Sequence, residues 1–225
     1  MAVFLGLSVF FALIIILIFF TSLIYSTLNK SGHNQYQQGE KRIIIVHGYS
    51  GDPNFHWYPW IKEEFNKDGV CVIIPKMPPG EFPRESAWVK VIRETVIRPD
   101  NNTYIIGHSL GVAAILRYLE TLGPNEQVGG VILIAGFSKS LGRKSKLNDF
   151  FKKEFDYKKI KSSSVRQIKL IYSSDDKVVS LSYGILLREH LNAELIILDG
   201  RGHFNQESDC MKLPELKDII SKLFK

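Results

Sequence analysis

Gly107-His108-Ser109-Leu110-Gly111 lies between two segments of different character. The apolar run 103–106 before it is typical of a buried strand, and the run 112–122 after it is typical of a helix. A serine at a sharp strand-to-helix turn is held clear of the backbone, and flanking glycines let the strand and the helix pack closely. The stretch therefore predicts an α/β architecture in which Ser109 is a candidate nucleophile. The alternative is a serine that only caps a helix.

Strand-like and helix-like segments alternate along the rest of the chain. The runs Val70–Ile74 and Val131–Ala135 are apolar throughout, which is typical of strands buried on both faces of a parallel sheet. This alternation predicts an α/β fold with about six mostly parallel strands and helices on both faces. The expected strands lie near residues 42–47, 70–75, 103–107, 129–135, 167–173 and 193–198.

Candidate partners for the serine follow two of the later strands. A serine hydroxyl is a weak nucleophile at neutral pH, so it needs a histidine base that is oriented by an acid. The strand near 167–173 runs into Asp175 and Asp176, and the strand near 193–198 runs into His203. The carboxyl ends of parallel strands share one edge of the sheet, where such loops can meet. We expect Ser109, one aspartate and His203 to form a triad, while the other aspartate is a turn residue.

Acyl transfer also needs two N–H donors for the oxygen that becomes negative. One is expected from the backbone of Leu110, directly after the serine, and the other from the backbone of Tyr49, in the loop after the first strand. The alternative for His47-Gly48 is a tight turn with no role in catalysis. This set predicts hydrolysis of an ester, thioester or amide without a cofactor. Because the cysteines and histidines show no metal-ligand spacing, we expect no metal.

Several segments are more specific than the serine motif: His56–Trp60, Lys76–Pro78, Arg84–Trp88, Arg117–Thr121, Asp175–Asp176 and Gly202–Phe204. With the serine motif they resemble the retinoblastoma-binding-protein-9-like small serine hydrolases, from about Lys41 to the C-terminus. The resemblance implies a compact α/β-hydrolase fold and an enzyme of the carboxylesterase or amidase type. In that family the second aspartate of the pair is the acid, which implies Asp176 here. The Leu-x-Cys-x-Glu motif is absent, so we expect no pocket protein of the retinoblastoma type as a partner.

The N-terminal residues differ in composition from the rest of the chain. Ala2–Tyr25 is apolar and uncharged, and at about 1.5 Å per residue a helix over this run could cross a hydrocarbon core of about 30 Å. We therefore expect a transmembrane anchor over residues 1–25, a polar linker over 26–41 and a hydrolase domain over 42–225. Lys30, Lys41 and Arg42 follow the run, which predicts a cytoplasmic hydrolase domain. A cleaved signal peptide is the alternative.

The net charge of +6 is concentrated between the fourth and fifth strands, at Lys139, Arg143, Lys144, Lys146, Lys152, Lys153, Lys158, Lys159, Lys161 and Arg166. We expect the segment 138–166 to form a short lid over the active site. It is either a solvated basic face or a surface that lies against anionic lipid. No recognition motif accompanies the charge, so nucleic acid is not an expected partner.

The leading hypothesis is thus a membrane-tethered serine hydrolase that acts on a small ester or amide. A non-catalytic binding module on the same scaffold is the rival, because a fold does not guarantee an activity. A peroxidase or lyase that uses the same three residues is a third possibility.

Overall fold

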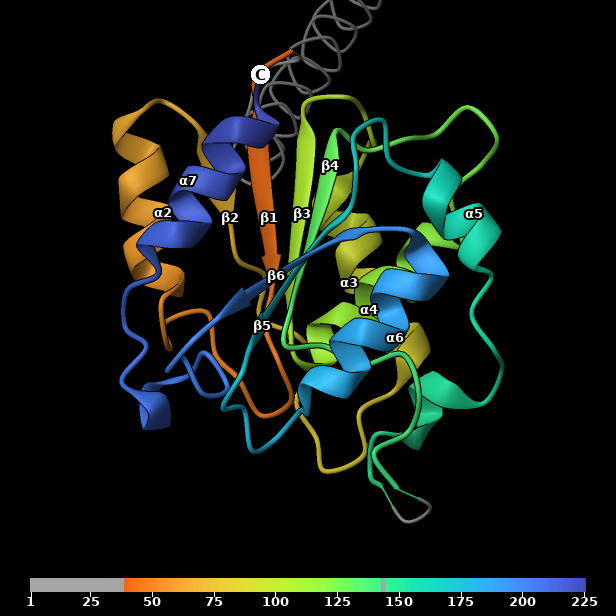
Figure 1. The fold of residues 1–225 in the computed structure, drawn as a ribbon. Coiled ribbons are helices and arrows are strands. Elements are labelled where there is room, and N and C mark those ends of the chain that lie inside the picture. The colour runs from red at the N-terminus through yellow and green to blue at the C-terminus, as the bar shows by residue number, and fades with distance from the viewer. Residues whose placement is uncertain (1–38, 143–144) are drawn as a thin grey trace, which may run out of the picture. The chain divides into compact units, whose positions relative to one another are not determined.

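The computed structural model describes residues 39–142 and 145–225. A six-stranded sheet of order β2-β1-β3-β4-β5-β6 forms its centre, and every neighbouring pair of strands is parallel (Figure 1). The strands are β1 (Arg42–Val46), β2 (Cys71–Ile73), β3 (Thr103–His108), β4 (Gly130–Ile134), β5 (Lys169–Ser173) and β6 (Glu194–Leu198). The α/β fold with six parallel strands predicted from the sequence is confirmed, and each strand lies within two residues of its expected bounds.

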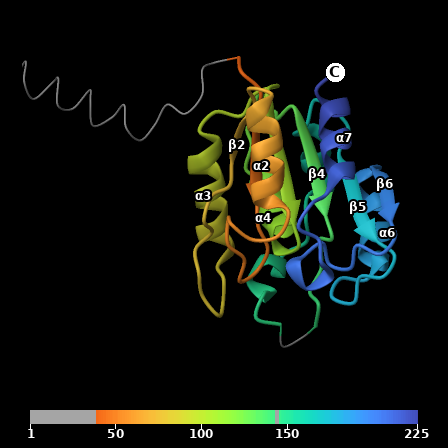
Figure 2. The same ribbon diagram turned by 90° about the vertical axis from the view of Figure 1, so that its left-hand side faces the viewer.

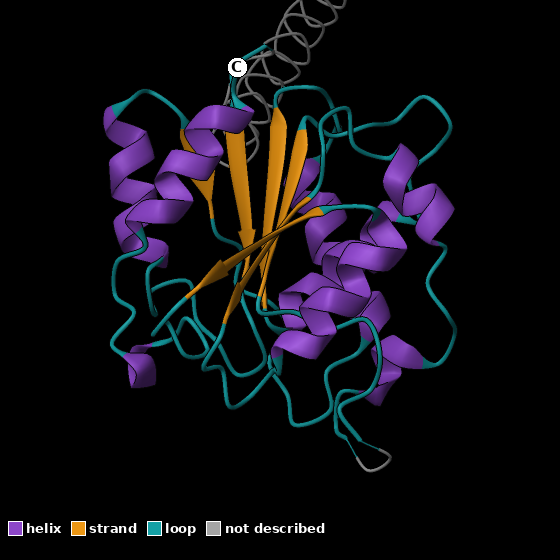
Figure 3. Ribbon diagram, viewed as in Figure 1, coloured by secondary structure: helices purple, strands orange, loops and turns teal. Residues whose placement is uncertain are grey.

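Helices cover both faces of this sheet, as Figures 2 and 3 show from two directions. One face packs against α2 (Tyr58–Lys67) and α7 (Pro214–Leu223). The other packs against α3 (Glu85–Val96), α4 (Leu110–Leu119) and α6 (Leu181–Leu191), with the short α5 (Tyr157–Ser162) beside them. Two short 3-10 helices, η1 (Asn148–Phe151) and η2 (Gln206–Ser208), complete the elements.

The sequence of β1 shows why the sheet is buried on both faces. All five of its residues are buried, and four of them are β-branched, a type that packs well on a pleated surface. Ile43 and Ile45 belong to the core beneath α2 and α7, whereas Ile44 and Val46 belong to the core beneath α3 and α4. A strand that supplies side chains to two cores needs a continuous apolar run, which explains the pattern seen in the sequence.

No helix within these described ranges is long and apolar enough to cross a bilayer. The longest of them, α3, has 12 residues, or about 18 Å, whereas a hydrocarbon core measures about 30 Å. This finding overturns the localisation predicted from the sequence, a single-pass membrane protein with a cytoplasmic hydrolase domain. The expected anchor over 1–25 and most of the expected linker over 26–41 lie outside the described residues.

Two of the charges that suggested the orientation have partners inside the fold. Arg42 is 1% exposed, and its guanidinium donates to the Asp100 carboxylate at 3.3 Å and to the Arg98 carbonyl. The Lys41 ammonium donates to the Phe224 carbonyl at 2.7 Å. Both side chains therefore hold the start of β1 against neighbouring segments. A count of basic residues along the sequence cannot distinguish such residues from those that would orient a protein in a membrane.

The segment 138–166 carries η1 and α5 between β4 and β5. Lysines of this segment form ion pairs with neighbouring acids: Lys146 with Glu81, Lys152 with Asp149 and Lys153 with Glu120. These pairs favour the solvated basic face over the lipid-binding surface, and association with a membrane finds no support. The role of the segment as a lid stays a prediction.

Candidate active site

Ser109 ends β3 and begins α4 in a strained conformation. Its φ and ψ are 55° and −121°, in a region that costs a residue other than glycine about 1–3 kcal/mol. The side chain makes no capping hydrogen bond to the helix. Instead, the Ser109 hydroxyl oxygen lies 3.0 Å from Nε2 of His203. The serine therefore faces a base, and the alternative of an ordinary helix cap does not describe it.

The glycines of the motif allow this turn to pack against the sheet. A Cβ on Gly111 would lie 2.2 Å from the Val46 carbonyl oxygen, and one on Gly107 would lie 3.0 Å from the Val112 Cα atom. Both contacts are with backbone atoms, which cannot rotate away as a flexible side chain can. The start of α4 can thus approach β1 only because Gly111 lacks a side chain, and it can approach β3 only because Gly107 lacks one.

His203 stands between the serine and a buried carboxylate. Its Nδ1 lies 2.8 Å from Oδ2 of Asp176, whose side chain is fully buried. The other oxygen of Asp176 accepts hydrogen bonds from the backbone N–H groups of Val178 and Val179, at 2.8 and 2.9 Å. A carboxylate only accepts, so neutral His203 donates its Nδ1–H to Asp176 and presents the lone pair of Nε2 to Ser109.

Asp175 has a different set of partners from its neighbour. Its Oδ1 accepts from the Ser173 hydroxyl at 2.5 Å and from the Gly202 N–H at 2.9 Å. These two hydrogen bonds lower the pKa of Asp175. They also tie the loop after β5 to the loop that carries His203. The two aspartates that the residue pattern left open are thus distinguished by geometry, with Asp176 on the imidazole and Asp175 on the backbone beside it.

The two N–H groups expected to form the oxyanion hole belong to Leu110, which directly follows Ser109, and to Tyr49, which directly follows Gly48. Gly48 passes so close to Ser109 that an added Cβ would lie 3.0 Å from the serine Cβ. Within the part of the chain that the structure describes, neither the Leu110 nor the Tyr49 N–H has a hydrogen-bond acceptor. An oxyanion hole requires such donors close to the serine oxygen, and the role of these two N–H groups stays a prediction.

His47 fixes the peptide that carries the Tyr49 donor. The Met77 N–H donates to Nε2 of His47 at 3.0 Å, so Nδ1 of the neutral ring carries the proton and donates to the Gly48 carbonyl at 2.8 Å. The Gly51 N–H reaches the same carbonyl at 3.1 Å. In a trans peptide the carbonyl and the following N–H point in opposite directions. Holding the Gly48 carbonyl therefore sets the direction of the Tyr49 N–H.

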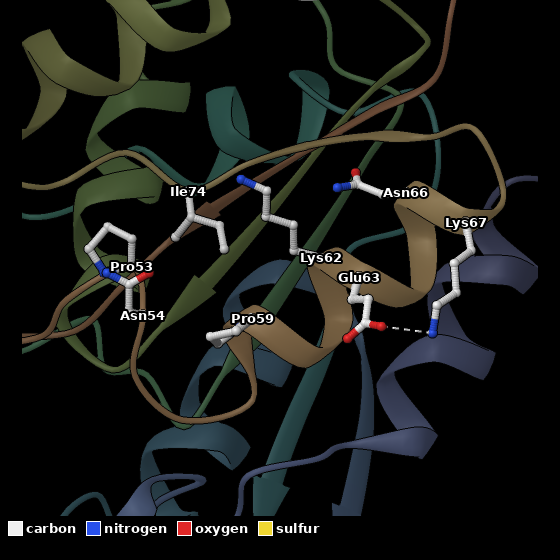
Figure 4. Close-up of a pocket in the computed structure, with 8 residues that line it drawn as sticks. All are labelled: Pro53, Asn54, Pro59, Lys62, Glu63, Asn66, Lys67 and Ile74. Carbon is white, nitrogen blue, oxygen red and sulfur yellow. Dashed lines mark ion pairs between the residues drawn. The ribbon is translucent and has the colours of Figure 1, made fainter.

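Ser109, His203 and His108 line a cavity of about 440 Å³, whose remaining walls come from the loop after β1 and from residues 205–207. No described residue of the segment 138–166 lines it. A larger hollow of about 560 Å³ lies along α2 (Figure 4), where its lining residues include Lys62 and the ion pair Glu63–Lys67. That hollow contains no nucleophile beside a base, so the cavity at Ser109 is the candidate active site.

His56 joins the two walls of this cavity, a role that the sequence did not reveal. Its Nδ1 accepts a hydrogen bond from the Gln206 N–H at 3.0 Å. The two residues are 150 positions apart, and neither lies in a pattern that indicates the contact. Its segment, His56–Trp60, does belong to those that resemble the known family.

Comparisons with known proteins agree with this geometry. Residues 43–222 match the serine hydrolase family model. YdeN of Bacillus subtilis (strain 168), which is named as a hydrolase, is 36% identical over 184 residues, covering 82% of this chain and 96% of that protein. Serine hydrolase RBBP9 of Rattus norvegicus is 30% identical over 167 residues, covering 73% of this chain and 87% of that protein.

The fold comparison gives the same result. The crystal structure of the B. subtilis ydeN gene product matches with a TM-score of 0.78 at 35% identity, and the match covers 82% of this chain and 98% of the other. A family match over most of the chain and two relatives at or above 30% identity lead to one conclusion. The chain belongs to the serine hydrolase family, whose members are small hydrolases with the α/β-hydrolase fold.

Proposed function

We propose that this protein hydrolyses a carboxylic ester, thioester or amide of a small molecule through a Ser109–His203–Asp176 triad and an acyl-enzyme. The observation that carries the proposal is the continuous contact from the Ser109 oxygen to His203 at 3.0 Å and from His203 to Asp176 at 2.8 Å. The cavity at Ser109 gives a substrate access to the serine oxygen. Family membership supports hydrolysis as the reaction class.

Each group has a defined part in the first half of the reaction. His203 accepts the Ser109 proton at Nε2 while the serine oxygen attacks the substrate carbonyl. The carbonyl oxygen becomes negative and accepts hydrogen bonds from the N–H groups of Leu110 and Tyr49. Asp176 stabilises the imidazolium through Nδ1. His203 then donates its proton to the leaving alcohol, thiol or amine, and the acyl-enzyme remains.

The second half repeats these steps with water as the nucleophile. His203 removes a proton from the water, which attacks the acyl carbonyl and forms a second tetrahedral intermediate. Collapse of this intermediate releases the carboxylic acid and returns the proton from His203 to the Ser109 oxygen. No cofactor takes part in either half.

Labelling with a fluorophosphonate probe tests the proposal. We expect the wild type to be labelled and Ser109→Ala to be unlabelled, because only an activated serine attacks the probe. Ser50→Ala is the matched control, since Ser50 lines the same cavity and has no hydrogen bond to His203. It should be labelled like the wild type.

Two results would contradict the proposal. Labelling that persists in Ser109→Ala would place the reactive group elsewhere. A folded wild type that resists the probe would favour the binding module instead. If the wild type is labelled but does not turn over p-nitrophenyl esters, the peroxidase or lyase alternative gains support.

A further inference from the structure

We propose that Tyr58 and His108 are positioning residues, which hold the backbone of His203 in place from α2 by a buried chain of hydrogen bonds. The inference rests on the proposed function, because it explains how the candidate base keeps its place beside Ser109. Neither residue contacts the reacting atoms, and both act through the groups that do.

The chain begins with two short contacts that have a fixed direction. The Tyr58 hydroxyl lies 2.6 Å from Nδ1 of His108, and Nε2 of His108 lies 2.8 Å from the carbonyl oxygen of His203. A carbonyl only accepts, so Nε2 of His108 carries the proton. In a neutral ring Nδ1 then accepts, which requires the Tyr58 hydroxyl to donate. Tyr58 is 0% exposed and His108 is 2% exposed, so water does not compete for these bonds.

Tyr58 belongs to α2, a helix that packs against the sheet. Burial raises the pKa of Tyr58, so its hydroxyl keeps the proton that it donates to His108. Hydrogen bonds therefore run without a break from α2 to the backbone of the candidate base. Bonds that share one direction polarise and strengthen one another.

The hydrogen-bond chain is neutral at His108, where a positive charge would oppose the proposed reaction. The rings of His108 and His203 are 5.1 Å apart, so a charged His108 would oppose the imidazolium that forms on His203. Burial, together with the nearby His203, His56 and His47, holds the pKa of His108 well below its usual range. His108 can thus anchor the His203 backbone without adding a second positive charge.

The loop that carries His203 has a particular need for an anchor. Gly202 and Phe204, its two neighbours, have φ values of 47° and 52°, so the backbone on both sides is in the left-handed region. The glycine adopts this conformation without cost, but Phe204 keeps it only when its surroundings hold it. A displacement of about 1 Å at a reacting group can cost about 100-fold in rate. The hydrogen bond from His108 to the His203 carbonyl limits this displacement.

Tyr58→Phe tests the chain because it removes one oxygen and keeps the ring. We expect the kcat for p-nitrophenyl acetate to fall on the order of 10-fold, with KM changed less than about two-fold, because positioning affects the chemical step more than binding. Tyr104→Phe is the matched control. Tyr104 lies in the same core, and its hydroxyl donates to the Leu223 carbonyl, far along the sequence from the triad. Its kcat should stay within about two-fold of the wild type.

A second pair of variants tests the donor on residue 108. His108→Gln keeps an N–H near the position of Nε2, whereas His108→Met has a similar length and no donor. We expect the glutamine variant to retain several-fold more kcat than the methionine variant. Each rate is divided by the fraction of sites that react with a fluorophosphonate, so that loss of folded protein does not appear as slow chemistry.

The outcomes separate the two proposals. If the wild type and Tyr104→Phe both lack turnover, the proposed function fails. If they turn over ester while Tyr58→Phe matches them, or while the two His108 variants are equally slow, the positioning role is overturned. A loss that appears only in KM or in the reactive fraction would indicate a structural role and would also overturn it. If Tyr58→Phe does not fold, the His108 pair decides.

Discussion

Asp175 and Asp176 are adjacent residues of one type, and their roles differ because their partners differ. Asp176 is buried, holds the His203 imidazole and is itself held by two backbone N–H groups. Asp175 accepts hydrogen bonds from Ser173 and from the Gly202 backbone, so it orders the loop without touching the imidazole. The charge on Asp176 can stabilise an imidazolium directly, while the charge on Asp175 cannot.

Replacing each aspartate by asparagine should separate these roles. Asp176→Asn keeps the shape but can donate to Nδ1 and favour the wrong tautomer of His203, so we expect kcat to fall by roughly 100- to 10,000-fold. Asp175→Asn keeps an acceptor oxygen for the Ser173 hydroxyl and the Gly202 N–H, so its kcat should fall by less than about 10-fold. Steady-state hydrolysis of p-nitrophenyl acetate measures both. Equal losses, or the reverse order, would mean that the acid is assigned wrongly.

The residues of the site differ in how far the sequence could identify them. Ser109, the aspartate pair and His203 each follow a strand, and parallel strands deliver such loops to one edge of the sheet. Their meeting could therefore be predicted from order alone, although the choice of Asp176 needed the family resemblance. The contacts of His108 with Tyr58 and with the His203 carbonyl join residues 50 and 95 positions apart. They depend on side-chain direction inside the core, which no local pattern encodes.

At the scale of elements, one arginine determines how the segment 138–166 is attached. Arg117 on α4 is fully buried and donates to the carbonyls of Phe150 at 2.8 and 3.0 Å, of Glu154 at 3.2 Å and of Lys153. It also pairs with Glu120 at 2.9 Å. The Arg117 side chain thus provides the hydrogen-bond donors for backbone carbonyls at the end of η1, and in this way attaches the segment to α4.

Arg117→Met should detach this segment from α4. The substitution leaves several carbonyls and Oε2 of Glu120 without the Arg117 donor, so we expect the free energy of unfolding to fall by about 3–5 kcal/mol. Lys152→Met is the matched control, because its pair with Asp149 is exposed and should contribute less than about 1 kcal/mol. Urea unfolding gives both values, and amide hydrogen exchange should show lost protection over 148–156 in Arg117→Met alone. Similar losses in the two variants would disprove the anchoring role.

Charge along the chain was a poorer guide to these elements than apolar pattern. The strands could be predicted because runs such as Arg42–Val46 must fill two cores, a requirement that acts on every residue of the run. No such packing requirement fixes the position of a lysine or an arginine. Lys146 and Arg42 are paired with acids in distant segments, and a count of basic residues along the sequence includes them all the same. The lipid surface and the orientation predicted from these charges depended on that count.

At the scale of the whole molecule, the fold gathers three histidines around one site, with His47 and His108 buried and His56 half-buried. His47 and His56 come from the loop after β1 and His108 from β3, and burial lowers the pKa of each below its usual value. Each one supports a backbone group of the site by accepting or donating a single hydrogen bond through a neutral ring. The folded state therefore does not bind protons at these three rings, whereas the unfolded state can. This difference makes the stability of the whole domain depend on pH.

This linkage predicts that stability falls in mild acid. In the unfolded chain a histidine takes up a proton near pH 6.5, whereas a histidine with a lowered pKa stays neutral in the folded state to a lower pH. The unfolded state then binds more protons, so stability decreases as pH falls through about 6.5, by up to about 1.4 kcal/mol per pH unit for each such histidine. Carboxylates such as Asp175, whose pKa is lowered by hydrogen bonds, act only below about pH 5 and do not mask this window.

Urea unfolding at pH 7.5, 6.5 and 5.5 measures the effect directly. We expect the free energy of unfolding to decline over this range in the wild type. His108→Gln cannot titrate at that position, so its decline should be shallower by up to about 1.4 kcal/mol per pH unit, even if its stability at pH 7.5 is lower. The difference between the two slopes isolates His108 from the other histidines. A wild-type decline that is no steeper than that of His108→Gln would contradict a neutral His108 in the folded state, and the hydrogen-bond chain through it could not then be correct.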